Sequence, residues 1–362
     1  MRTRVIPNSG IAVSQISFGA GTAAGLMLQA PGPEQIATVE RALEIGINHF
    51  DTSPIYGDGR SEVNLGQALK AVGAQVVLTT KVSVAPEHLM LSGDGAIARG
   101  VRKSVLASLS RLQRDHVDIL LLHNATDFGR DFSNERLPHL SLDDIFGERG
   151  VWEEAQALIG EGKVRAFGLS GQDNVPEALM AAAATGRIAI FNQPFNLLNP
   201  TAAWPGPRHQ GAGAAGRPPF LRDFDVDYTG VMEFARAQQV GVSVISPVAA
   251  GVLTGSAQAG ILPPAVSGWR VRFPRPGQYE QELAAGAGFA AVARSHGLGV
   301  TELAYRFALS QSAVTTVVGG FSNVAQLDEV AAFADAPPLS DEVLDAVAKA
   351  TAALPDAVAD SR

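Results

Sequence analysis

The strongest constraint on the fold is a series of eight short apolar segments that alternate with longer segments of helical period. Each apolar segment is hydrophobic nearly throughout, as expected of strands that are buried on both faces of a parallel sheet. The predicted strands are QISFGA near Ile16, INHFD to Asp51, QVVLTTK to Lys81, VDILLLH to His123, VRAFGLS to Ser170, IAIFNQ to Gln193, VSVIS to Ser246 and TTVVGG to Gly320.

The segments between the predicted strands have the pattern of amphipathic helices. In EQIATVERALEIG, apolar residues recur at intervals of three and four positions and stop at Gly46. PEALMAAAATG opens with Pro176 and closes on Gly186, which is the expected asymmetry of helix ends. Helices are also predicted for IARGVRKSVLASLSRLQ and VAQLDEVAAF. Alternation of strands and helices predicts parallel pairing with right-handed crossovers.

Eight strand–helix units in 362 residues fit a closed (β/α)8 TIM barrel, which needs about 250 residues plus insertions. The alternative is an open doubly wound sheet, whose first strand usually leads into a G-x-G-x-x-G turn. Here Gly19, Gly21 and Gly25 do not keep that spacing, so the barrel is favoured. The sequence has no linker that would divide the chain, and we expect residues 1–362 to form a single domain.

Two long insertions interrupt the strand–helix rhythm, at about residues 124–150 and 194–227. Both are longer than ordinary loops between a strand and a helix. Each follows the carboxyl end of a predicted strand, and this is the barrel face on which active sites are built. We therefore expect both insertions to lie over the active site.

Composition excludes several classes of protein. The net charge of -8 and the sequence pI of about 5.4 argue against nucleic-acid partners and anionic membranes, which both attract basic surfaces. The chain has 0 cysteines, and none of its 7 histidines form a ligand-spaced pair, so we predict neither disulfides nor a metal site. It has no signal-peptide pattern and no apolar run of the ~20 residues that a membrane span needs. We expect a soluble cytoplasmic protein.

Four polar side chains lie at the ends of the first predicted strands. Asp51, Lys81 and His123 each end a strand, and Tyr56 follows shortly after Asp51. In a barrel the carboxyl ends of all strands open onto one face, so these side chains would meet there. Taken singly, each has an ordinary structural explanation as a turn residue, a solvated lysine or a structural histidine. Their occurrence together predicts an active site.

These four residue types suit hydride transfer to or from a carbonyl group. Reduction leaves an alkoxide that must be protonated, and a tyrosine hydroxyl is a weak acid with a pKa of about 10. We expect the Lys81 ammonium to lower the pKa of Tyr56, and Asp51 to hold the lysine in place. His123 would donate to the substrate oxygen and fix its direction.

With these residues in place, the chain resembles the aldo-keto reductases over nearly its whole length. The similar stretches are IPNSGIAVSQISFGAG, FDTSPIYGDGRSEVNLGQAL, TTKV, VDILLLH, EGKVRAFGLS, FNQ, ISPVAAGVLTG and GGFSNVAQLDE. The Asp-Thr-x-x-x-Tyr-Gly-x-x-x-Ser-Glu arrangement from Asp51 to Glu62 is highly specific. The resemblance implies a (β/α)8 barrel that begins with a β-hairpin. It also implies that Tyr56 is the general acid/base, with Asp51, Lys81 and His123 as its partners.

The resemblance further implies a nicotinamide dinucleotide on the same barrel face. Ser170 and Gln193 match positions that bind the carboxamide, but Gly171 stands where the family usually has asparagine. Ile245 takes the place of an aromatic residue that often stacks on the nicotinamide. The remaining predicted cofactor contacts are Ser246, Gly251, Leu253, Gly320, Ser322, Gln326 and Glu329.

The segment GGFSNVAQLDEV contains no cation, whereas NADP-dependent relatives place Arg or Lys there to bind the 2′-phosphate. Gln326 lies where an arginine is common, and Val330 replaces an asparagine. We therefore predict NAD as the preferred cofactor, with NADP possible. The alternative interpretation of this segment is an ordinary helix N-terminus capped by Asn323.

The stretch SPIYGDGRSE is similar to bacterial members that oxidise free sugars or pyridoxal. We predict a dehydrogenase or reductase of small hydroxylated carbonyl compounds, such as a sugar hemiacetal oxidised to its lactone. The candidate substrate contacts on the insertions are Asn124, Trp204, Arg208 and His209. The alternatives are an NADPH-dependent aldehyde reductase and a non-catalytic nicotinamide-sensing regulatory subunit, like the β-subunits of potassium channels.

Overall fold

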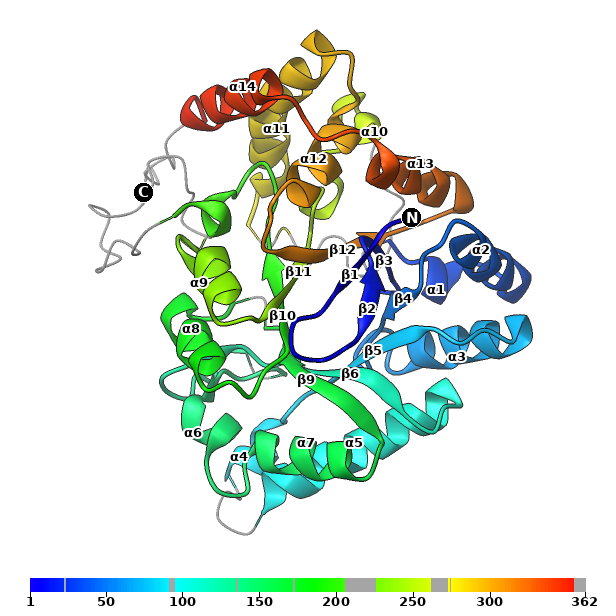
Figure 1. Cartoon of the computed structure of the whole chain (residues 1–362), viewed down its shortest axis with the longest axis vertical. Helices are drawn as coiled ribbons and strands as arrows, with labels where there is room; N and C mark the ends of the chain where they lie inside the picture. The colour runs from blue at the N-terminus through cyan, green and yellow to red at the C-terminus, as the bar shows by residue number, and fades with distance from the viewer. Residues whose placement is uncertain are drawn as a thin grey trace.

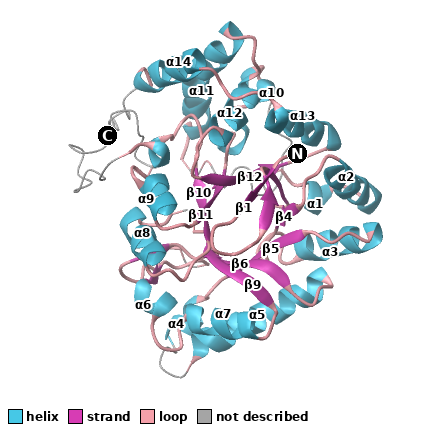
Figure 2. Cartoon of the chain, viewed as in Figure 1, coloured by secondary structure: helices cyan, strands magenta, loops and turns pink. Residues whose placement is uncertain are grey.

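Eight parallel strands form a closed barrel in the computed structural model, which describes residues 1–22, 24–90, 95–134, 136–171, 173–205, 226–261, 273 and 275–354. The order around the barrel is β10-β11-β12-β3-β4-β5-β6-β9. The strands lie at the centre of the molecule, with helices around them (Figure 2). The strands are β3 Ile16–Gly19, β4 His49–Asp51, β5 Val77–Val82, β6 Val117–Leu122, β9 Val164–Leu169, β10 Ile190–Pro194, β11 Gly241–Ile245 and β12 Val314–Gly320. The predicted barrel and its eight strands are confirmed.

Helices surround the barrel on its outside (Figure 1). The main ones are α2 Gly32–Glu44, α3 Arg60–Val72, α5 Ala96–Leu112, α7 Val151–Gly160, α8 Pro176–Ala184, α9 Val231–Ala237, α11 Gln278–Ser295, α12 Val300–Leu309, α13 Val324–Asp335 and α14 Asp341–Ala352. Shorter helices are α1 Leu26–Gln29, α4 Pro86–Met90, α6 Leu142–Phe146 and α10 Gly255–Gln258. All four helices predicted from periodicity are present, and Pro176 occupies the first turn of α8 as expected.

A β-hairpin closes the amino end of the barrel. Its strands, β1 Thr3–Val5 and β2 Ala12–Ser14, pair antiparallel. The buried side chains of Ile6, Ile11 and Val13 pack against inward-facing residues of the strands. These inward-facing residues are Ile119, Leu121, Ala166 and Ile190. Because the hairpin fills this end, the carboxyl ends of the strands are left as the open face of the barrel.

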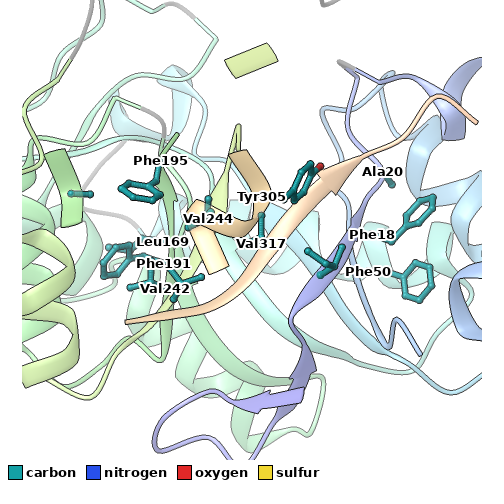
Figure 3. Packing of buried hydrophobic residues seen from close by; sticks show 14 of the residues in the cluster. Phe18, Ala20, Phe50, Leu169, Phe191, Phe195, Val242, Val244, Tyr305 and Val317 are labelled. Atoms are coloured by element: carbon teal, nitrogen blue, oxygen red, sulfur yellow. The ribbon is translucent and has the colours of Figure 1, made fainter. Parts of the chain in front are cut away.

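The larger part of the core lies between the barrel and its helices (Figure 3). Side chains alternate along a strand, so that Phe50 points outward and packs against Phe18, with ring centroids 5.3 Å apart. Its neighbours His49 and Asp51 are buried on the opposite side of β4. The alternation therefore directs Asp51 into the barrel at the carboxyl end of its strand.

The first insertion starts at the carboxyl end of β6 and packs against the segments that follow β5 and β9. It contains a short parallel pair, β7 Thr126–Asp127 with β8 Leu140–Ser141, followed by α6. Ser141 caps α6 through a reciprocal bond with Asp144, and Arg130 forms an ion pair with the same carboxylate. Of the second insertion, residues 194–205 and 226–227 are described; they include the short 3-10 helix η1 Thr201–Ala203.

A buried histidine lies in the barrel below the open face. Nδ1 of His49 is 2.6 Å from the Ser17 hydroxyl, and Nε2 is 2.7 Å from the Thr79 hydroxyl. Burial, reinforced by the charge of Lys81, lowers the pKa of His49 from 6.5 to about 3. Both ring nitrogens are thus engaged by neutral hydroxyls, and the imidazole is uncharged in the folded protein at neutral pH.

The first prediction concerns acid stability. Below pH 6.5 the unfolded chain takes up a proton at His49 and the folded chain does not, so the free energy of unfolding should fall as the pH drops. This one group contributes up to about 1.4 kcal/mol per pH unit between pH 6.5 and 3. In urea unfolding at a series of pH values, His49→Gln should lack this contribution. The matched control is His116→Gln at an exposed position, and an equal pH dependence in wild type and His49→Gln would contradict the prediction.

Candidate active site

A buried ion pair occupies the centre of the open face. Lys81 is the penultimate residue of β5 and Asp51 ends β4, and these strands are neighbours in the barrel. The Lys81 Nζ lies 2.5 Å from Asp51 Oδ1 and donates a second hydrogen bond of 2.9 Å to the Thr52 carbonyl oxygen. The Lys81 side chain is 1% exposed and that of Asp51 is 8% exposed. The lysine therefore points into the site and not into bulk solvent.

Tyr56 lies directly beside this ammonium group. It belongs to the turn between β4 and α3, where its backbone N–H donates to the Ser53 carbonyl oxygen. The Lys81 Nζ is 4.9 Å from the centroid of the Tyr56 ring, and the His123 ring stands edge-on to it with centroids 5.9 Å apart. The four residues predicted to meet at this face thus do lie together, although they come from three strands and a turn.

The last two residues of the Asp-Thr to Ser-Glu motif hold the Tyr56 turn in place. The Ser61 hydroxyl donates to the Ala20 carbonyl oxygen at 2.8 Å. Glu62 is fully buried, accepts from the Thr80 hydroxyl at 2.5 Å and forms an ion pair with Arg111 at 2.6 Å. These bonds tie the start of α3 to β5, next to Lys81. The motif therefore encodes the support of this site as well as Asp51 and Tyr56 themselves.

Electrostatics in the site differ in one respect from the sequence-based expectation. Burial raises the pKa of Tyr56 above its usual value of 10.0, and the Lys81 charge opposes this shift without cancelling it. The expected lowering of the Tyr56 pKa is therefore wrong for the protein without ligand. Burial destabilises the phenolate by more than the Lys81 ammonium stabilises it. For Lys81, burial is the largest influence and favours the neutral amine. Asp51 and Tyr56 together outweigh it, so the pKa of Lys81 is raised.

His123 follows β6 and is held by a residue that the sequence analysis did not single out. Its Nδ1 lies 3.1 Å from the hydroxyl oxygen of Ser53, which is fully buried in the segment after β4. Burial, with a smaller contribution from Lys81, lowers the pKa of His123 from 6.5 to about 3. The ring is therefore neutral near pH 7 and carries a proton on only one nitrogen.

Next to the tetrad, the ends of β9 and β10 offer groups that fit a nicotinamide carboxamide. Ser170 is buried, and its hydroxyl accepts a 2.8 Å hydrogen bond from the Asn192 side chain. Asn192 Oδ1 and Gln193 Oε1 are both buried and have no hydrogen-bond partner among the described residues. Buried acceptors without a partner are rare in folded proteins, and the amide NH₂ group of a bound ligand would satisfy one of them. Asn192 is a further residue that the sequence analysis missed.

Gly171 has a structural reason to differ from the asparagine that is usual in the family. A Cβ at this position would come within 2.5 Å of Ala125 Cα and 2.9 Å of the Asn124 carbonyl oxygen. The backbone of the first insertion thus lies directly against residue 171. Asn174 bridges the two segments, since it accepts from the Thr126 N–H and donates to the Gly171 carbonyl oxygen.

The loop after β11 has an unusual backbone. Ser246, Ala249 and Ala250 all adopt positive φ angles, of 56°, 47° and 54°, which are disfavoured for residues with a Cβ. Such strain is common at ligand-binding segments. The backbone N–H groups of Gly251 and Leu253 donate to carbonyl oxygens within the loop, and the Leu253 side chain is fully buried. A contact of this loop with the pyrophosphate remains a prediction.

The segment after β12 begins α13 with a side-chain cap. Asn323 is the N-cap and accepts from the Gln326 N–H, while the Gln326 side chain accepts from the Ser322 N–H at 2.8 Å. Gly320, Gln326 and Glu329 are exposed. The alternative interpretation of this segment as a capped helix N-terminus is correct for its local structure, and it does not prevent cofactor contact.

The candidate substrate contacts have different surroundings. Asn124 is fully buried; its side chain exchanges hydrogen bonds with the Val84 backbone and donates to the Pro138 carbonyl oxygen. Its amide is therefore used to anchor the first insertion, which corrects the expectation that it faces substrate. Trp204 is half-buried at the end of η1. Arg208 and His209 lie outside the described residues.

Comparison with known proteins agrees with this geometry. The model of the aldo/keto reductase family matches residues 15–352, and the chain belongs to this family. It is accordingly an oxidoreductase that works with a nicotinamide nucleotide on small carbonyl compounds. No helix in the described part of the chain is long and apolar enough to cross a membrane.

Two kinds of relative are similar over nearly the whole chain. L-galactose dehydrogenase of Arabidopsis thaliana is 30% identical over 332 residues, which cover 90% of this chain and 86% of the relative. Among solved structures, aldo-keto reductase AKR11C1 from Bacillus halodurans (holo form) has a TM-score of 0.67 at 22% identity, covering 97% of this chain and 96% of that one. Glycerol dehydrogenase AKR11B4 from Gluconobacter oxydans has a TM-score of 0.69 at 24% identity, covering 99% and 98%. These two structures support the fold.

The second prediction concerns the close contact at Gly171. Gly171→Ala should lower the free energy of unfolding by about 1–3 kcal/mol, because the added methyl group collides with backbone atoms. The control is Gly160→Ala at the end of α7, where a Cβ meets nothing within 4 Å and alanine favours the helix. Urea unfolding of both variants measures the difference. Equal stability of Gly171→Ala and wild type would contradict the proximity of the insertion.

Proposed function

We propose that the protein is an NAD-preferring dehydrogenase that interconverts a small hydroxylated carbonyl compound and its alcohol, with Tyr56 as general acid/base. The single observation that carries this proposal is the buried Lys81–Asp51 ion pair beside the Tyr56 ring. Burying a charged pair costs free energy, and the stability of the fold does not require the pair to lie beside a tyrosine side chain. The charge is useful there because proton transfer at the hydroxyl passes through the phenolate.

In this proposal each residue of the tetrad has a separate task. A bound nicotinamide supplies or accepts the hydride. During reduction the Tyr56 hydroxyl gives its proton to the substrate oxygen, and during oxidation the phenolate takes that proton back. Lys81 stabilises the phenolate in both directions, and Asp51 keeps the ammonium charged and in position. The neutral His123 donates a hydrogen bond to the substrate oxygen.

A preference for NAD is supported by the charges around the start of α13. The segment from 320 to 329 has no Lys or Arg, and it ends with the carboxylates of Asp328 and Glu329. Arg41 on α2 reaches Asp328 at 2.7 Å, but this guanidinium is also paired with Glu44. A 2′-phosphate would therefore approach two carboxylates without a cation reserved for it. The diol of NAD carries no such charge.

The proposed substrate class rests on the hydroxyl-rich compounds in the names of the relatives. L-galactose and glycerol are the substrates that two of them are named for. A free sugar presents its anomeric C–H and hydroxyl on the same carbon, so hydride and proton can leave together and a lactone results. We therefore propose a sugar or small polyol as the substrate, oxidised in the direction that an NAD cofactor favours.

The third prediction tests the role of Tyr56. Tyr56→Phe should lose turnover by at least about 100-fold, because no other group can carry the proton, while folding and cofactor binding are retained. Turnover is followed at the absorbance of reduced nicotinamide with a panel of aldoses and aldehydes. Tyr279→Phe, on α11 outside the barrel, removes a hydroxyl elsewhere and serves as the control. A Tyr56→Phe rate close to wild type would remove the mechanism.

The fourth prediction tests the cofactor preference. Fluorescence titration of the wild type should give tighter binding for NADH than for NADPH. Gln326→Arg should improve NADPH binding by about 10-fold, the value of one charge-assisted hydrogen bond to phosphate. The control is Gln311→Arg, which adds the same charge before β12, at the opposite end of the barrel. Tighter NADPH binding by wild type would refute the preference.

A further inference from the structure

We propose that Ser53 is a positioning residue that holds His123 in the tautomer with its proton on Nε2. The inference rests on the proposed function to the extent that this proton is the one offered to the substrate oxygen. The Ser53 hydroxyl itself takes no part in the chemistry. Its oxygen Oγ lies 3.1 Å from His123 Nδ1.

The position of Ser53 leaves its hydroxyl few choices of partner. Ser53 is fully buried, two residues beyond Asp51, so water does not reach it. The backbone N–H of Ile55 points at the same oxygen at 3.4 Å and uses one of its acceptor sites. Within the described residues, His123 Nδ1 is the one group placed to accept the hydroxyl proton.

The single proton of the Ser53 hydroxyl decides the tautomer of His123. A serine hydroxyl has one proton to donate and two lone pairs to accept with. If His123 carried its proton on Nδ1, Ser53 would accept from both Ile55 and His123, and its own buried proton would have no acceptor. Leaving a buried donor without a partner is unfavourable. The arrangement that satisfies every group has Ser53 donating to Nδ1, and the neutral ring then carries its proton on Nε2.

His49, the other buried histidine of the barrel, differs from His123 in the number of ring nitrogens that have a partner. Both nitrogens of His49 are engaged by hydroxyls, those of Ser17 and Thr79, so its ring is fully used in holding the strands together. His123 has a partner on Nδ1 alone among the described residues, and its ring forms a T-shaped pair with the ring of Tyr56. Its second nitrogen is thus left for a ligand.

The direction of the hydrogen bond determines what His123 can do for a substrate. With the proton on Nε2, the ring donates to a carbonyl or hydroxyl oxygen held between His123 and Tyr56. In the other tautomer, a lone pair on Nε2 would face the lone pairs of a carbonyl oxygen and repel it. Protonation of both nitrogens is opposed by the burial of the ring and, to a smaller extent, by the neighbouring Lys81 ammonium. A hydrogen bond that fixes Nδ1 as an acceptor is the remaining way to guarantee the donor.

The test is nitrogen NMR of the protein labelled with ¹⁵N-histidine, with the His123 signals assigned by His123→Gln. Wild type should give an acceptor-type shift for Nδ1 and a protonated shift for Nε2. Ser53→Ala should mix the tautomers and lower kcat by about 10- to 100-fold, with cofactor Kd unchanged. Ser53→Thr, which keeps the hydroxyl, should restore both the shift pattern and kcat.

The control is Thr38→Val, which removes a buried hydroxyl on α2 that is bonded to the Glu34 carbonyl oxygen and not to a histidine. It should leave the His123 shifts unchanged. A protonated Nδ1 in wild type, or an unchanged tautomer in Ser53→Ala, would overturn the proposal. If Ser53→Ala does not fold, the wild-type shifts decide alone. Absence of nicotinamide-dependent turnover with a normal Nε2 tautomer would instead refute the proposed function and leave the role of Ser53 standing.

Discussion

The site depends on one interaction, the ion pair between Lys81 and Asp51 inside the mouth of the barrel. Removing an ammonium group from water costs free energy. The attraction of a single carboxylate seldom offsets this cost unless the other N–H groups of the ammonium also form hydrogen bonds. Here the Thr52 carbonyl oxygen accepts a second bond from the ammonium, and the Tyr56 hydroxyl interacts with it as well. The pair therefore fixes the ends of β4 and β5 relative to each other and directs a permanent positive charge at Tyr56.

The barrel provides the conditions under which such a pair can exist. The hairpin closes the amino end with apolar side chains, so the polar interior faces solvent and ligands only at the carboxyl end. Glu62 binds both Thr80 and Arg111, which braces the turn that carries Tyr56 against β5 and α5. Rigid support of this kind matters because acid–base catalysis depends on the hydroxyl staying within hydrogen-bonding distance of the reacting oxygen.

Two features of the site, the glycine at position 171 and the burial of Asn124, have a common physical origin in the first insertion. Its backbone passes so close to residue 171 that only glycine fits, and Asn174 then joins the two segments. The amide of Asn124 is consumed in holding the same insertion to Val84. The packing of this insertion thus leaves no room for the asparagine that is usual at position 171 and takes up the Asn124 amide. The acceptor oxygens of Asn192 and Gln193 remain buried beside the tetrad.

The sequence by itself determined the barrel, since eight nearly continuous apolar strands alternate with helices of period 3.6 and leave few other ways to bury them. It also determined that Asp51, Lys81, His123 and Tyr56 share one face, because strand ends in a barrel all open there. The net pKa direction of Tyr56 was decided only by the tertiary structure, because desolvation depends on burial from every side. So were the contact of Ser53 with His123 and the burial of Asn124, which join residues far apart in the chain through distances that no local pattern encodes.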